Sequence, residues 1–357
     1  KNFNTSDHLD PKEVRRIDPF IQYGLIAANQ SISDSGILEY ESLNKEKVGI
    51  NFGAGIGGIQ TIENNKMILE SKGHKKVSPF FVPGSIVNMI SGLVSIKYGF
   101  MGPNTSVVTA CSTGNHCIGT AARSIACGEA DVMIAGGAEM ASTPLSIAGF
   151  ISARALSTNS DPESACRPWD KDRDGFILAD GAGSLVLEDY EHAKQRNAHI
   201  YAEIIGFGMS SDAYHMTAPP EDGRGAALSM KNALIDAEIN ADEIDYINAH
   251  GTSTPLGDLA ETRALKTIFT NTMPSISSTK SMTGHTLGAA GAIESIFCIK
   301  SLNDNVVPPT INLINQDSEC DLDYTALRSV EKKVTLAMNN SFGFGGTNAA
   351  LVFERVS

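Results

Sequence analysis

Apolar runs alternate along the chain with stretches rich in small residues at helical spacing. Three continuous apolar runs, bounded by glycine or small-residue turns, predict buried strands at residues 47–55 (KVGINFGAG), 105–110 (TSVVTA) and 130–140 (ADVMIAGGAEM). Residues 117–128 (CIGTAARSIACG) predict a tightly packed helix that ends at glycine. This alternation is typical of α/β layering, in which helices cover the faces of a sheet.

The second half of the chain repeats the order of elements of the first. Residues 175–193 (GFILADGAGSLVLEDYEHA) predict two strands around a glycine turn, followed by a helix. A strand entering a loop, a small-residue helix and a glycine-centred strand pair then recur at residues 244–254, 283–302 and 334–356. Preserved order favours an internal duplication. We expect two similar α/β halves, residues 1–195 and 196–357, whose corresponding loops meet at one shared site.

Composition narrows the class of protein. The chain has 357 residues, 42% hydrophobic and 19% charged, which is ordinary for a globular protein with a sizeable core. A net charge of −13 argues against nucleic acid or an anionic membrane surface as the main partner. No apolar run approaches the roughly 18 residues of a membrane helix, so we expect no membrane span.

Six cysteines at irregular spacing, with no C-x-x-C pair, predict neither a disulfide framework nor a structural zinc site. A reducing compartment such as the cytoplasm fits them best.

Residues 53–58 (GAGIGG) satisfy the G-x-G-x-x-G pattern directly after a predicted strand. A dinucleotide-binding turn also needs an acidic residue about 20 positions later. That region here is basic and is interrupted by glycine and proline (ESKGHKKVSPFF). The sequence therefore favours glycines that allow close backbone approach along a pocket wall.

Cys111 is predicted to end a buried strand and open a helix. A thiol at a helix N-terminus meets free N–H groups and the positive end of the helix dipole, which predicts a pKa below the usual value of about 8.5. The alternative is a buried structural cysteine, which suits Cys117, Cys127 and Cys298 within apolar helical stretches.

Two histidines flanked by glycine are candidates to act with Cys111. His250 follows a predicted strand in NAHGTSTPLGD, and His285 precedes a predicted helix in SSTKSMTGHTLGAAGA. Functional residues concentrate at such junctions, although most single histidines are surface or core residues. Two neutral imidazoles that donate to one carbonyl oxygen would stabilise an enolate.

Glu294 lies in a helix that is otherwise too apolar to be a solvated face. A buried glutamate needs a partner, and Lys280 is one candidate. Residues 339–348 (NNSFGFGGTN) place Phe342 and Phe344 among glycines, in a loop able to bring a backbone N–H against a ligand. A hairpin turn explains the same residues, and the two interpretations are compatible.

The segments TACSTG, NAHGTSTPLGD, SSTKSMTGHTLGAAGAIES and NNSFGFGGTN, in that order, resemble the condensing enzymes of fatty-acid synthesis. The similarity is greatest to the elongating β-ketoacyl-acyl-carrier-protein synthase II family, and it covers essentially the whole chain. It implies a thiolase-like fold with five layers, α-β-α-β-α, and a homodimer. Members open with a strand and helix that this sequence lacks, so we expect the first sheet to lack an interior N-terminal strand.

The resemblance also implies a role for individual residues. Cys111 would take the acyl chain from the acyl carrier protein, and His250 and His285 would hold the malonyl thioester carbonyl during decarboxylation. The backbone N–H groups of Cys111 and Phe344 would form the oxyanion hole. Lys280 and Glu294 match the family's supporting pair, and Phe344 matches its gating phenylalanine.

The remaining positions carried over are substrate-binding or docking residues. They are Ile56, Phe150 and Phe342 around the acyl chain; Arg154, Thr217, Thr252 and Thr254 near the phosphopantetheine arm; and Lys12, Arg15 and Arg16 in a basic patch for the acidic carrier protein. Neither a metal nor a resident cofactor is implied, because phosphopantetheine arrives attached to the carrier protein.

Other functions fit the sequence less well. Thiolases use a second catalytic cysteine and coenzyme-A-priming synthases replace one histidine by asparagine, so the Cys–His–His set disfavours both. A chain-length-factor-like partner subunit would lack the nucleophile, and Cys111 is present. A polyketide ketosynthase of the same fold stays open. A Cys–His hydrolase also stays open, and burst labelling by an acyl thioester without net hydrolysis would exclude it.

Overall fold

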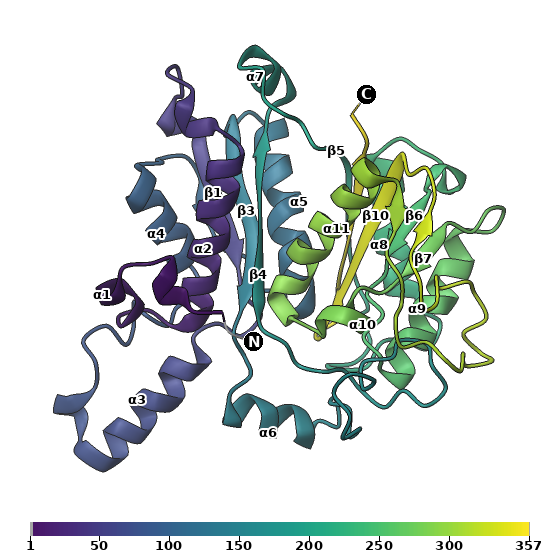
Figure 1. Cartoon of the computed structure of the whole chain (residues 1–357), viewed down its shortest axis with the longest axis horizontal. Coiled ribbons are helices and arrows are strands. Elements are labelled where there is room, and N and C mark those ends of the chain that lie inside the picture. Colours follow the sequence, from purple (N-terminus) through teal and green to yellow (C-terminus); the bar gives the residue numbers. More distant parts are fainter. Residues whose placement is uncertain (1–2, 357) are drawn as a thin grey trace.

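The computed structural model describes residues 3–356 and consists of five layers in the order α-β-α-β-α (Figure 1). Each of the two main sheets is covered on its outer face by helices of its own half. Helices α5 (Thr113–Ala126) and α11 (Ala290–Asp304) lie between the sheets and form the middle layer (Figure 1). Within the described residues, no helix combines the length and the apolar character that crossing a membrane requires.

The first sheet has the strand order β2-β1-β3-β4. β2, β1 and β3 run parallel, and β4 is antiparallel to β3. Every residue of β1 and β3 is buried, as expected for strands covered on both faces. The elements of this half are β1 (Val48–Gly53), β2 (Asn104–Thr105), β3 (Val132–Glu139), β4 (Gly181–Glu188), α1 (Pro11–Val14), α2 (Pro19–Asp34), α3 (Ile59–Lys72), α4 (Met89–Tyr98), α5, α6 (Pro144–Ser152) and α7 (Tyr190–Gln195).

The second sheet has the order β5-β11-β10-β6-β7. β10, β6 and β7 are parallel, whereas β10 with β11 and β11 with β5 are antiparallel. The elements are β5 (Glu203–Ser211), β6 (Tyr246–Asn248), β7 (Ser275–Ser277), β10 (Leu336–Gly343), β11 (Thr347–Glu354), α8 (Arg224–Asp236), α9 (Pro255–Ile268), α10 (Lys280–Thr283) and α11, with a separate short pair, β8 (Val306–Val307) and β9 (Val330–Glu331). The order β7-β6-β10-β11 in the second sheet corresponds to the order β2-β1-β3-β4 in the first. The two sheets therefore show the predicted duplication.

Three predictions about the first half were wrong in detail. The strand predicted at 105–110 covers only the end of β2, because the chain then leaves the sheet to form a 3₁₀ turn, Ala110–Ser112. Residues 175–188 do not contain two strands: the pair equivalent to β10 and β11 is β3 and β4, and residues 176–178 make only isolated bridges. The first sheet was expected to lack an interior strand: it has four strands where the second sheet has five, but the strand without a counterpart is β5, which lies at an edge.

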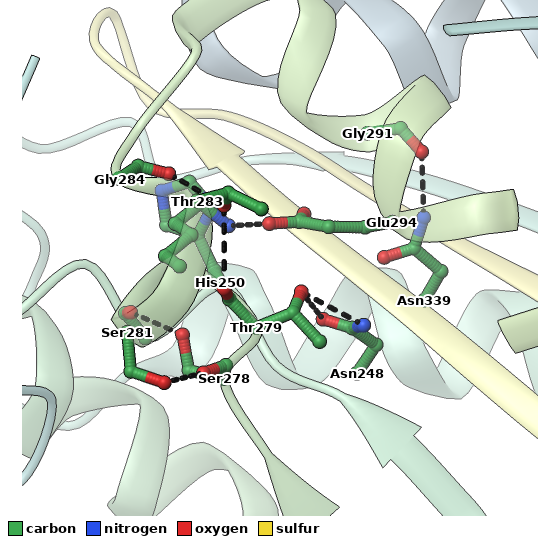
Figure 2. Close-up of polar contacts among 12 residues, drawn as sticks. Asn248, His250, Ser278, Thr279, Ser281, Thr283, Gly284, Gly291, Glu294 and Asn339 are labelled. Carbon is green, nitrogen blue, oxygen red and sulfur yellow. Dashed lines mark hydrogen bonds and ion pairs between the residues drawn. The ribbon is translucent and has the colours of Figure 1, made fainter. Parts of the chain in front are cut away.

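The two halves come into close backbone contact where α5 and α11 begin. A Cβ atom on Gly114 would lie 2.5 Å from the backbone nitrogen of Ala292, and one on Gly291 would lie 2.7 Å from that of Asn115. The Asn115 and Asn339 side chains bridge the halves, because each amide donates to the other residue at 3.0 Å. Asn339 also donates to the Gly291 carbonyl at 2.8 Å (Figure 2). Small residues are therefore required at this contact.

We predict that Gly114→Ala destabilises the protein, because its methyl group would meet backbone rather than a movable side chain. Urea denaturation should show a loss of about 1–3 kcal/mol in the free energy of unfolding. Gly149→Ala is the matched control, since α6 leaves open space around Gly149 and alanine should raise stability by about 0.5–1 kcal/mol. Equal effects of the two substitutions would contradict this account.

Candidate active site

A cavity of about 470 Å³ is lined by residues of both halves. Most of the predicted site residues line it: Cys111, His250, His285, Ile56, Phe150, Arg154, Thr217, Thr252, Thr254, Phe342 and Phe344. Lys280 and Glu294 are buried behind this wall. Lys12, Arg15 and Arg16 are exposed on and just after α1 and do not line the cavity.

Cys111 sits in the 3₁₀ turn Ala110–Ser112 directly before α5. Ala110 has a φ of +50°, a strained conformation for a residue with a side chain, and this sharp turn presents the next residue to the cavity. The second half holds the turn in place: Thr347 donates its hydroxyl to the Thr109 carbonyl at 3.0 Å and lies 3.0 Å from the Ser112 hydroxyl. The nucleophile turn is thus fixed by β11.

His250 and His285 reach the same point from two loops of the second half. Their rings lie 5.4 Å apart, edge to face, and the His250 ring also lies 5.6 Å from Phe342. The first half fixes the backbone of His285, because its N–H donates to the Ile177 carbonyl at 2.7 Å and its carbonyl accepts from Ala179 at 3.0 Å. Burial and the nearby Lys280 ammonium lower the pKa of both histidines well below the usual value, so both are neutral imidazoles at neutral pH.

One ligand-type atom from each of Cys111, His250 and His285 lies within 4.8 Å of the others. A sulfur and two imidazole nitrogens are also a donor set that a soft metal ion accepts. The Lys280 ammonium acts against such an ion, because it already lowers the pKa of both imidazoles by disfavouring positive charge there. The arrangement suits proton exchange and hydrogen bonding to a bound carbonyl better than metal binding.

Lys280, the first residue of α10, forms an ion pair with Glu294 of α11, as the sequence predicted, and both side chains are almost completely buried. In Figure 2 the Glu294 carboxylate points toward the group of residues that includes His250 and Thr283, and the dashed line at this carboxylate marks the ion pair. Burial raises the pKa of Glu294 to about 7, while Lys280 opposes that shift. The pair keeps a positive charge beside the two histidines without leaving it uncompensated.

The low pKa expected for Cys111 from the sequence was wrong. Burial raises the pKa of the thiol to about 12, against the lowering effects of the Lys280 ammonium and the Phe344 N–H, and the carboxyl group of Glu139 adds to the rise. The helix N-terminus predicted from the sequence is present, but loss of water around the sulfur outweighs it. Cys111 therefore rests as a thiol, and its proton must leave during reaction.

Sequence reasoning missed several residues that shape the site. The Glu261 carboxylate, on α9, accepts hydrogen bonds from the backbone N–H groups of His250, at 2.9 Å, and Gly251, at 2.7 Å. It thereby fixes the loop that carries the histidine. Leu287 and Phe176 line the cavity beside Cys111, and the Phe176 ring lies 5.2 Å from that of His285. The sequence did contain one signal for Glu261, an acidic residue on the buried face of an amphipathic helix. Its partners could not be recognised, because they are backbone N–H groups.

The residues predicted to lie near the phosphopantetheine arm are found at the mouth of the cavity. The Thr252 and Thr254 hydroxyls lie 3.0 Å apart, Arg154 adopts a φ of +53°, and Thr217 is exposed at the rim. Phe344 is 37% exposed at the tip of the β10–β11 turn, so its side chain can move without disturbing the core. Polar groups thus surround the entrance, while the interior beyond Cys111 is apolar.

Comparison with known proteins identifies the family. Residues 4–193 match the N-terminal domain of β-ketoacyl synthases, and residues 201–314 match the C-terminal domain. The chain belongs to the β-ketoacyl synthase family. A 3-oxoacyl-[acyl-carrier-protein] synthase 2 from Coxiella burnetii is 55% identical over 100% of this chain and 86% of its own length. A synthase 2 from Staphylococcus aureus is 49% identical over 99% of this chain and 86% of its own length.

Solved structures confirm the predicted ketosynthase fold. A β-ketoacyl synthase from Burkholderia phymatum gives a TM-score of 0.93 at 37% identity, covering 100% of this chain and 87% of that one. A ketosynthase of a type II polyketide synthase, solved with its acyl carrier protein and bound to the hexaketide, gives 0.91 at 35% identity, with 95% and 85% covered.

The raised pKa of Cys111 predicts how this β-ketoacyl synthase reacts with alkylating agents. Because only the thiolate is nucleophilic, the rate of Cys111 alkylation by iodoacetamide should rise with pH and not level off below about pH 10. Peptide mapping by mass spectrometry measures the rate, and a Cys127→Ser background removes Cys127, which is exposed and not buried as the sequence predicted. A plateau below pH 8 would show instead that the helix N-terminus dominates.

Proposed function

We propose that this chain is an elongating β-ketoacyl-acyl-carrier-protein synthase, an acyltransferase that lengthens an acyl chain by two carbons with loss of carbon dioxide. The observation that carries the proposal is the convergence of Cys111, His250 and His285 within 4.8 Å at an apolar cavity. A nucleophile supplies the covalent acyl intermediate, and two neutral imidazoles supply the donors for an enolate.

In the first step, the Cys111 sulfur attacks the thioester carbonyl of the acyl carrier protein. The backbone N–H groups of Cys111 and Phe344 point toward the sulfur and stabilise the oxyanion that forms beside it. The bond from the acyl carbon to the pantetheine sulfur breaks, and the thiol proton of Cys111 passes to that departing sulfur, with a neutral imidazole within reach to carry it. The acyl chain is left on Cys111.

In the second step, the malonyl thioester loses carbon dioxide, and its electron pair becomes an enolate whose oxygen accepts hydrogen bonds from His250 and His285. The enolate carbon then attacks the acyl–Cys111 carbonyl, and a carbon–carbon bond replaces the carbon–sulfur bond. Cys111 leaves as a thiolate, which the Lys280 ammonium stabilises, since its charge lowers the pKa of this sulfur. The product is a β-ketoacyl thioester on the carrier protein.

The apolar lining supports fatty acyl chains as substrates. Phe150, Phe176 and Leu287 pack around Cys111, and Ile56 lies on the same cavity wall. Relatives 49–55% identical over nearly the whole chain carry the synthase 2 name, whereas the polyketide ketosynthase neighbour is 35% identical. The presence of Cys111 disfavours a non-catalytic chain-length-factor role. The reaction uses no resident cofactor, and a cytoplasmic location belongs to the same proposal.

A homodimer is part of the proposal, and the edge of the first sheet supports it. β2 is an edge strand with both residues exposed, so its outer backbone groups are free to pair. Ile96, Met101 and Val108, near this edge in sequence, are 76%, 67% and 53% exposed. Exposed apolar side chains close in sequence to a strand edge that no other described strand covers favour association with a second copy of the chain.

The catalytic roles predict separable losses. Cys111→Ala should abolish acyl transfer and elongation, because no sulfur remains to hold the acyl chain. His250→Ala and His285→Ala should each slow malonyl-carrier decarboxylation by about 10²–10³-fold, the usual cost of losing an oxyanion donor. Elongation assays that resolve product chain lengths, with decarboxylation measured separately, test both.

Cys117→Ala is the matched control, since this buried thiol does not line the cavity, and it should keep most of the activity. Wild-type elongation by Cys111→Ala, or unchanged decarboxylation in either histidine variant, would disprove the mechanism.

We also propose that Lys12, Arg15 and Arg16 bind the acidic carrier protein. Changing their charge should then affect recognition of the carrier protein and nothing else. Reversing Lys12, Arg15 and Arg16 to glutamate should raise KM for acyl carrier protein about tenfold, because like charges repel the acidic partner. Transfer from a small pantetheine thioester should not change. Reversing the exposed Lys194, Lys231 and Lys300 alters net charge equally and serves as control. Equal KM increases in both triple variants would locate docking elsewhere.

A further inference from the structure

Glu139, the last residue of β3, is completely buried, and its carboxylate accepts backbone hydrogen bonds from two distant segments. The donors in the loop after β1 are the N–H groups of Gly55 at 2.6 Å, Ile56 at 3.1 and 3.2 Å, and Gly57 at 3.0 Å. The fourth donor is the N–H of Gly288 at 3.1 Å, in the second half. One carboxylate therefore joins the two halves next to the cavity.

Nothing of opposite charge compensates Glu139: among residues 3–356, none of the ion pairs includes it. Burial raises the pKa of its carboxyl group to about 7, and the four N–H groups oppose that rise. A buried acid held only by backbone dipoles is costly to maintain. Its position therefore calls for a function beyond filling space.

The duplication shows which residue of the first half corresponds to Gly288, the fourth donor to Glu139. The turn Ala110–Ser112 and α5 are equivalent to the turn Leu287–Ala289 and α11, and both turns open with a strained residue, Ala110 at φ +50° and Leu287 at φ +48°. Counting along each turn, Gly288 takes the place of Cys111.

The strand ends correspond in the same way. β3 and β10 hold equivalent places in their sheets, and each has eight residues, so Glu139 takes the place of Gly343. At Gly343 there is no side chain: its ideal Cβ position lies 2.7 Å from both the Thr109 carbonyl oxygen and the Thr347 hydroxyl, and 3.2 Å from the Cys111 nitrogen. In the second copy the corresponding residue carries a carboxylate, which accepts a hydrogen bond from the Gly288 N–H, the group that corresponds to the N–H of Cys111. Glu139 thus occupies the counterpart of the oxyanion site.

Both segments that Glu139 joins form the cavity wall. Ile56 and Leu287 line the cavity, and Leu287 packs in the same cluster as Cys111, Phe150 and Phe176. The approach is tight, because a Cβ atom on Gly288 would lie 2.2 Å from the Gly55 nitrogen. His285 has separate backbone partners in Ile177 and Ala179, so its position does not depend on Glu139 alone.

We propose that Glu139 is a positioning residue for the acylation step: by filling the second copy of the oxyanion site, it holds Ile56 and Leu287 as the two walls between which the acyl chain extends from Cys111. This inference rests on the proposed function of the chain. Glutamine cannot replace Glu139, because an amide has only one acceptor oxygen. Its NH₂ group would point at backbone N–H donors that now donate to a carboxylate oxygen.

The test compares Glu139→Gln with the wild type in three assays: transfer of an acetyl group from carrier protein to Cys111, transfer of a dodecanoyl group, and malonyl-carrier decarboxylation. On this proposal the dodecanoyl chain, and not the two-carbon acetyl group, is expected to extend past Ile56 and Leu287. We expect kcat/KM for dodecanoyl transfer to fall at least about tenfold more than that for acetyl transfer, since displacements near 1 Å carry such costs. Decarboxylation should stay within about twofold.

Asp170→Asn is the matched control. Asp170 is also buried and accepts three backbone N–H groups, from Asp172, Ile314 and Asn315, none of which lines the cavity. It should lower the melting temperature without changing the ratio of dodecanoyl to acetyl transfer. Should Glu139→Gln fail to fold, Glu139→Asp gives the same readout, because its shorter side chain cannot reach all four donors.

A double-mutant cycle with Ile56→Ala tests the route of the effect. If Glu139 acts through this wall, Glu139→Gln should change the dodecanoyl-to-acetyl ratio much less in the Ile56→Ala background than in the wild type. An unchanged ratio in the Glu139 variants, or equal losses in transfer and decarboxylation, overturns the inference alone. A wild-type protein that neither accepts acyl groups nor decarboxylates malonyl carrier overturns the proposed function instead.

Discussion

The close contact between the first turns of α5 and α11 is the constraint on which the site depends. Gly114 and Gly291 allow the two helices to approach until backbone meets backbone, and Asn339 of β10 bonds to both, to Asn115 of α5 and to the Gly291 carbonyl of α11. Because Cys111 stands just before one helix and His285 just before the turn that leads into the other, this single contact sets the spacing of nucleophile and histidine. A larger residue at either glycine would separate groups that no flexible side chain could bring back together.

Burial then decides the electrostatics. The same removal of water raises the pKa of Cys111, Glu139, Glu261 and Glu294 and lowers that of both histidines. Burial thus disfavours the charged form of each of these groups, and Glu294 is the one of them that forms an ion pair, with Lys280. The site therefore starts from thiol and neutral imidazole, and charge appears only as bonds change. Fixed donors act most strongly on charge that develops in such a water-poor place.

The sequence predicted the layers, the duplication and the convergence of Cys111, His250 and His285, because glycine-flanked junctions after apolar runs mark the strand ends where a site can form. It failed where tertiary contacts override local pattern. Residues 105–110 look like a strand but leave the sheet to form the strained turn at Ala110. Residues 176–179 look like a strand but serve as backbone partners of His285. The thiol pKa was misjudged because a helix N-terminus is visible in sequence and burial is not.

Glu139 and Glu261 were missed for a shared reason: their partners are backbone N–H groups of distant segments, which leave no side-chain pattern to recognise. Only the duplication, seen in three dimensions, gives Glu139 its meaning. A twofold-repeated fold generates two equivalent pockets of backbone donors, one beside Cys111 and one beside Gly288. Two open pockets in one cavity would compete for the same carbonyl oxygen and would leave buried N–H groups unsatisfied in the copy that has no nucleophile. Placing a carboxylate in that copy removes the competition, satisfies the donors and converts the unused pocket into a wall. A glycine at position 343 and a glutamate at position 139 are therefore two parts of one solution, by which a symmetric scaffold comes to hold a single reaction centre.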